Sequence, residues 1–119
     1  MLRFAFILAV GLFLQPVAAR AHSHLDHATP AAGSTVAQAP TEVVLWFTKD
    51  LEPAFSTLEV RSMDGTAMQA GNSAVDPKQH TLMRVPLKAL PPGTYKVIWR
   101  VLSVDTHRTQ GDFTFRVGP

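Results

Sequence analysis

The chain has 119 residues, 46% of them hydrophobic, and its 11 basic and 9 acidic residues give a formal net charge of +2. This length fits one domain, and the weak charge gives no support for nucleic-acid or anionic-membrane binding. Because cysteine is absent, the fold can use neither disulfides nor thiolate metal ligands and must depend on its apolar core.

The first 21 residues have the pattern of a secretory signal peptide. Arg3 is followed by an apolar run of 11 residues, Phe4 to Leu14, and small residues lead to the cleavage motif Ala19-Arg20-Ala21. The run is shorter than the roughly 20 residues of a transmembrane helix, although the unusual Arg20 leaves an uncleaved anchor as the alternative. We therefore expect a signal peptide at 1–21 and export of one formally neutral domain, 22–119, that begins with His22.

Five segments of this domain are rich in β-branched and aromatic residues, and turn-forming residues separate them. The expected strands are Thr41–Phe47, Thr57–Arg61, Thr81–Leu87, Thr94–Val104 and Asp112–Val117. Within the fourth, alternation places one apolar set on a single face: Tyr95, Val97, Trp99 and Val101. No segment has a sustained helical period. The pattern predicts an all-β fold, a small antiparallel Greek-key β-sandwich of the Ig-like or cupredoxin-like type.

Three histidines, His22, His24 and His27, lie within the first six residues of the expected mature chain. As a free N-terminus, His22 would offer a metal both its α-amine and its ring Nδ1. His24 has the spacing at which the amine, two deprotonated amides and an imidazole close a square plane around Cu(II) or Ni(II), of which Cu(II) binds more strongly. The alternative is an ordinary histidine-rich, unstructured terminus.

A second candidate group, Ser103-Val104-Asp105-Thr106-His107, follows the long fourth strand. Asp105 and His107 are two residues apart, so on continuing strand geometry they share a face. The carboxylate can bind a metal directly or orient the imidazole. Alternatively, Asp105 only stabilises the turn by Asx hydrogen bonding.

With these residues the chain resembles the CopC/PcoC family of periplasmic copper-binding proteins, whose mature chains begin with histidine and carry a Ser-x-Asp-x-His motif near the C-terminus. The matching residues include His22, Ser103, Asp105, His107 and the run Leu90–Trp99. The resemblance implies a β-sandwich that binds one Cu(II) per chain through the N-terminal amine, His22, Asp105 and His107. Some members add a third-position histidine, here His24, and whether His24 or His27 has this role stays open. The implied partners are the copper ion and an inner-membrane copper transporter of the CopD type, and we expect a monomer that binds no nucleic acid.

The chain departs from the family pattern at two places. Members with a second, Cu(I) site have a dense methionine motif, whereas this domain has only Met63, Met68 and Met83, with His80, and these are expected in loops and core. Some members have an acidic residue after the first long strand, where this chain has Lys49. Whether Asp50 or Glu52 substitutes for it is open.

The leading functional hypothesis is a non-enzymatic Cu(II) carrier or buffer in copper resistance or homeostasis, because a site of nitrogen and carboxylate donors without sulfur suits Cu(II). The first alternative is a copper-dependent oxygenase with the same ligands, which also needs an open coordination position and a surface for its substrate. Core packing is expected to account for Trp46, Trp99 and Tyr95, so no such surface and no catalytic residue is predicted. The second alternative is a metal-free adhesive or structural module.

Overall fold

The computed structural model describes residues 25–119, together with Ala5 and Gly11. The expected cleavage site and the predicted ligands His22 and His24 lie outside the described residues. In the described part of the chain, no helix has the length and apolarity that a membrane crossing requires. The elements are β1 Leu25–Thr29, β2 Thr35–Val36, β3 Glu42–Phe47, the 3-10 helix η2 Pro53–Phe55, β4 Thr57–Ser62, β5 Ala74–Val75, β6 Leu82–Pro86, β7 Gly93–Leu102 and β8 Arg108–Val117.

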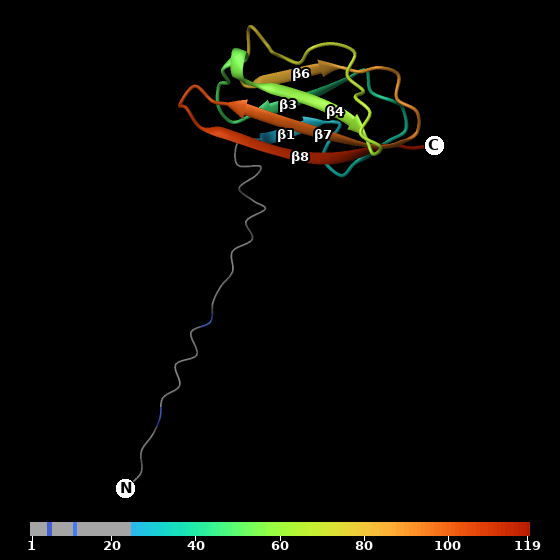
Figure 1. Ribbon diagram of the computed structural model, residues 1–119, viewed down its shortest axis with the longest axis horizontal. Helices are drawn as coiled ribbons and strands as arrows, with labels where there is room; N and C mark the ends of the chain where they lie inside the picture. The colour runs from blue at the N-terminus through green and yellow to red at the C-terminus, as the bar shows by residue number, and fades with distance from the viewer. Residues whose placement is uncertain (1–4, 6–10, 12–24) are drawn as a thin grey trace.

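The strands form two four-stranded sheets, one with the order β1-β3-β6-β5 and the other with the order β2-β8-β7-β4 (Figure 1). The chain crosses from one sheet to the other at every connection from β1 to β5 and again between β6 and β7, as in Greek-key sandwiches. All strand pairs are antiparallel except β2 with β8, which is parallel. The predicted β-sandwich is therefore confirmed, with one short parallel pair that the sequence did not indicate.

The core lies between the two sheets, and the long strand β7 supplies much of it. Tyr95, Val97, Trp99 and Val101 are all buried, which confirms the face that alternation predicted. Trp99 is completely buried and meets the ring of Phe47 edge to face, with ring centroids 5.6 Å apart. This contact joins β7 of one sheet to β3 of the other.

Trp46 does not belong to this core, so the expectation that core packing accounts for it is wrong. Its neighbours Leu45 and Phe47 are buried, and because side chains alternate along a strand, Trp46 points to the outer face of its sheet. There its half-buried ring stacks on His27 of β1, with ring centroids 4.3 Å apart and planes inclined by 10°. The sequence shows this alternation, but it does not show that β1 pairs with β3 and places a histidine beside Trp46.

The two tryptophans should differ in what they contribute to stability. Trp99→Ala is expected to lower the free energy of unfolding by about 3–5 kcal/mol, because it leaves a large cavity in the core. Trp46→Ala should cost about 1 kcal/mol, because the ring is only half buried. Urea denaturation followed by far-UV circular dichroism measures both losses. Equal losses would contradict the different positions of the two side chains.

Candidate metal centre

The turn between β7 and β8 brings Asp105 and His107 together. Nδ1 of His107 lies 3.2 Å from Oδ1 of Asp105. The hydroxyl of Ser103, a completely buried residue, donates to the same carboxylate oxygen. Oδ2 of Asp105 accepts a hydrogen bond from the ammonium group of Lys49. Each carboxylate oxygen is therefore held by a neighbour, and the imidazole lies at its edge.

The two residues meet in a turn and not on a strand. β7 ends at Leu102, so the predicted extension of the strand to Val104, and with it the shared strand face, is wrong. The amides of Ser103 and Thr106 donate to the carbonyls of His107 and Ser103, at 3.0 and 2.9 Å, and Thr106 has a φ of 72°. A β-branched residue rarely adopts a positive φ, so these hydrogen bonds hold a turn that places Asp105 beside His107.

The segment after β3 fixes this turn from the other side. Leu51, which is 1% exposed, forms a β-bridge with Ser103. The amide of Val104 donates to the carbonyl of Asp50 at 3.0 Å. The side chain that extends from this segment to Asp105 is that of Lys49. The sequence does not predict this ion pair, because Lys49 and Asp105 are 56 positions apart.

Hydrogen bonds from Lys49 and then Ser103 hold the pKa of the Asp105 carboxyl well below its usual range. The ionised form is therefore the one that the fold stabilises. An ionised carboxylate next to an imidazole is a pair of nitrogen and oxygen donors, without sulfur, that fits Cu(II). With the Nδ1 proton directed at Asp105, the lone pair of His107 would be on Nε2, the arrangement that carboxylate partners commonly give to metal-binding histidines.

The described residues do not by themselves form a metal site. Among residues 25–119, no group of three or more histidine, aspartate or glutamate side chains is placed to hold a metal ion. His27 does not join Asp105 and His107, because its Nδ1 lies 2.7 Å from a carboxylate oxygen of Asp26 and its ring stacks on Trp46. His22 and His24 stay predictions.

The methionines occupy different environments. Met83 on β6 is completely buried, Met68 packs against the core, and Met63 is 65% exposed. His80 is exposed, and its carbonyl accepts a hydrogen bond from the amide of Leu51 at 2.9 Å. These positions agree with the expectation that the methionines lie in loops and core.

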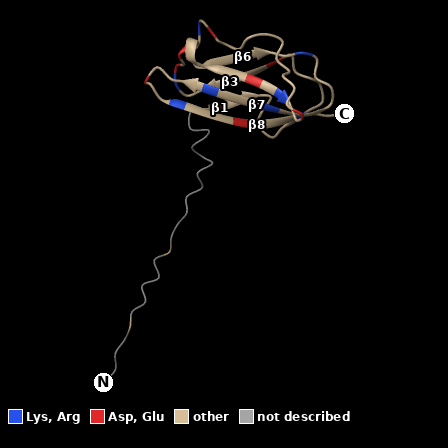
Figure 2. Cartoon of the chain, in the orientation of Figure 1, with Lys and Arg blue, Asp and Glu red and all other residues tan. Residues whose placement is uncertain are grey.

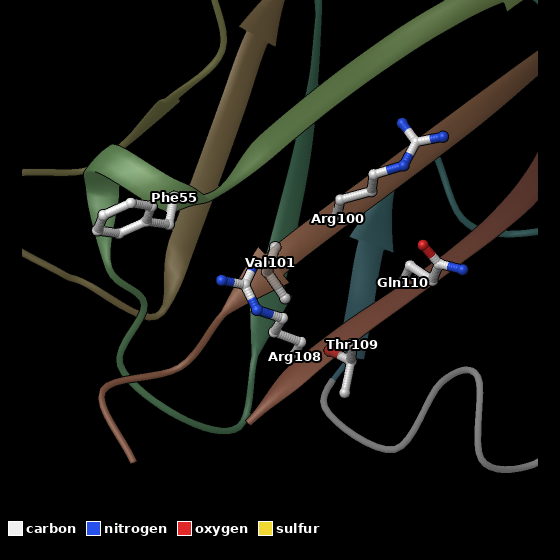
Figure 3. Close-up of a pocket in the computed structure, with 6 residues that line it drawn as sticks. All are labelled: Phe55, Arg100, Val101, Arg108, Thr109 and Gln110. Carbon is white, nitrogen blue, oxygen red and sulfur yellow. The ribbon is translucent and has the colours of Figure 1, made fainter. Parts of the chain in front are cut away.

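A pocket of about 330 Å³ begins at Arg108, the residue after His107 (Figure 3). It lies across β7 and β8, with the ring of Phe55 from η2 at one end. Its lining residues are Phe55, Arg100, Val101, Arg108, Thr109 and Gln110. The two guanidinium groups disfavour a metal cation, so this pocket is not part of the metal centre.

Elsewhere on this sheet, basic and acidic residues are interspersed along the strands (Figure 2). Lys96 pairs with Asp112 at 4.0 Å, and Arg61 and Arg100 both pair with Glu59, at 3.1 and 3.7 Å. These pairs lie on the outer face of the sheet. Lys49 differs from them because its partner carboxylate also contacts a histidine.

Comparisons with known proteins agree with one another. Residues 25–118 match the CopC domain family. Copper resistance protein C of Pseudomonas syringae pv. tomato is 38% identical over 122 residues, covering 96% of this chain and 94% of that protein. Protein YobA of Escherichia coli (strain K12) is 40% identical over 101 residues, covering 82% of this chain and 79% of that protein.

Solved structures give the same result for the fold. The crystal structure of CopC from Methylosinus trichosporium OB3b has a TM-score of 0.75 at 32% identity, covering 82% of this chain and 95% of that one. The crystal structure of PcoC, a methionine-rich copper resistance protein from Escherichia coli, has a TM-score of 0.66 at 32% identity, covering 79% of this chain and 96% of that one.

The contacts of Asp105 predict how it titrates. In an NMR pH titration, its carboxyl pKa should lie well below the usual value of about 3.9 and should rise in both Lys49→Gln and Ser103→Ala. Because the folded-state pKa is lowered, these contacts stabilise the fold above the unfolded pKa, and this stabilisation is lost as the pH falls through the folded pKa. Asp64, whose pKa is lowered to about 2 by hydrogen bonds from Ser62 and Thr66, is the internal control. An Asp105 pKa that is the same in all three proteins would contradict the described contacts.

Proposed function

The chain belongs to the CopC family, and we propose that it is a periplasmic Cu(II)-binding protein that carries or buffers copper in copper resistance or homeostasis. Relatives named copper resistance protein C support the copper-resistance role. They also favour a non-catalytic carrier over a copper oxygenase with the same ligands. The signal-peptide pattern in residues 1–21 supports export, with cleavage before His22.

We propose that the metal centre combines the N-terminal amine and ring of His22 with the Asp105–His107 pair, and that His24 is an additional ligand. The observation that carries this proposal is the register of β1 on β3, in which Leu25 lies opposite Phe47. Lys49, two residues after Phe47, contacts Asp105. Residues 22–24 can span at most about 10–11 Å, so a mature N-terminus at His22 would lie within this distance of Leu25. Leu25 is at the end of the sandwich that presents Asp105 and His107, which supports the proposal.

The donor set supports one Cu(II) per chain. Amine, imidazole and carboxylate donors suit Cu(II), whereas thioether sulfur would favour Cu(I). The sulfur atoms of Met63, Met68 and Met83 lie in an exposed turn, against the core and inside it, so no tight Cu(I) site is proposed. The resemblance to the family supports a monomer that exchanges copper with an inner-membrane transporter of the CopD type.

The free N-terminus is the first test of the centre. Adding one methionine before His22 should weaken Cu(II) binding by about a hundredfold or more, because the amine and Nδ1 of His22 then no longer form one chelate. Mass spectrometry of the exported protein establishes where the mature chain begins. A competition titration against a chromophoric chelator then compares the two proteins, and equal affinities would refute the role of the terminus.

The turn is the second test. His107→Ala should weaken Cu(II) binding by more than Asp105→Asn, because the first removes an imidazole donor. We expect a loss of about tenfold to a hundredfold for Asp105→Asn, the range for groups that orient a metal-binding histidine. His27→Ala is the matched control and should change the affinity little, because His27 does not join this pair. If both turn variants bind Cu(II) as tightly as the wild type, the metal is held by the N-terminal residues alone.

A further inference from the structure

Lys49 forms an ion pair with Asp105, whose carboxylate is a proposed ligand of the metal. Its Nζ forms an ion pair with Oδ2 of Asp105, while Oδ1 faces Ser103 and His107. The side chains of Lys49 and Asp105 are 47% and 35% exposed. Such a pair stabilises a fold little, so its importance lies in the charge that it places at the centre.

Backbone contacts on both sides of Lys49 keep its backbone close to the turn that carries Asp105. Before it, the amide of Phe47 donates to the carbonyl of Thr81 at 2.8 Å. After it, Asp50 accepts from the amide of Val104, and Leu51 bridges to Ser103. A metal ion that binds at Asp105 and His107 would therefore meet a cation whose backbone cannot move away.

We infer that Lys49 lowers the Cu(II) affinity that the ligands of this centre would otherwise give. It competes with Cu(II) for Asp105 and holds the carboxylate in place without metal. Its charge also weakens the bound state, so that copper is released more readily. The inference rests on the proposed function. For a single positive charge about 5 Å from a divalent ion in a water-like dielectric, Coulomb's law gives a reduction in affinity of about tenfold. Salt reduces this effect, because the pair is partly exposed.

The test uses the mature protein that begins at His22, with Cu(II) affinity measured by competition against a chromophoric chelator at constant pH and ionic strength. Lys49→Gln should bind Cu(II) about tenfold more tightly than the wild type. Lys49→Glu should bind about a hundredfold more tightly, because it replaces a repelling charge with an attracting one. Both gains should shrink as the salt concentration rises.

Two control variants separate the charge of Lys49 from its shape and from the net charge of the protein. Lys49→Arg keeps the charge and should stay within about twofold of the wild type. Lys96→Gln removes one charge from another lysine–aspartate pair. Lys96 lies six residues before Leu102 on β7, about 20 Å by strand rise, so Cu(II) affinity should not change.

The outcomes distinguish this inference from the proposed function. A wild type that binds Cu(II) with a Lys49→Gln variant that binds equally or more weakly would overturn the inference and leave the function intact. Equal gains in Lys49→Gln and Lys96→Gln would also overturn it, because net charge would then explain both. Failure of the wild type and all variants to bind Cu(II) would refute the proposed function, and the inference with it. Circular dichroism of each variant confirms that the compared proteins are folded.

Discussion

The candidate site depends on the contact between the β7–β8 turn and the segment that follows β3. Leu51 bridges to Ser103, and the carbonyl of Asp50 accepts a hydrogen bond from Val104. These contacts join residues about fifty positions apart at one end of the sandwich. Without them, Asp105 would not face Lys49, and the start of β1 would have no fixed relation to His107.

The core sets this arrangement by fixing the positions of the strands. Trp99 of β7 packs edge to face on Phe47 of β3. This contact holds the two sheets together close to the turn, because β7 ends at Leu102, three residues after Trp99. β7 and β8 pair over ten residues, from Gly93 with Val117 to Leu102 with Arg108. The turn is consequently a short connection on a long hairpin, which suits a metal centre because Asp105 and His107 then need little ordering on binding.

The long strands could be predicted from the sequence because alternation and β-branched composition are local signals. The short strands β2 and β5 have two residues each and carry no such signal. β1 has the composition of a polar terminus, and only its pairing with β3 identifies it as a strand.

The pairing of Asp105 with His107 was predicted from strand spacing, but a turn produces it. The contact of Lys49 with Asp105 could not be predicted, because it depends on tertiary packing across the molecule. His22 and His24 lie outside the described residues, so their part in the site rests on the sequence and on the family.

The central claim is that one Cu(II) is held jointly by the N-terminus and by the β7–β8 turn. Diffraction from crystals of the Cu(II)-loaded chain that begins at His22, recorded at the copper absorption edge, tests it most directly. The account predicts a single copper peak bonded to the amine and ring of His22 and to the ring of His107, with Asp105 at the same site. A copper ion bound only by His22 and His24, away from Asp105 and His107, would contradict it.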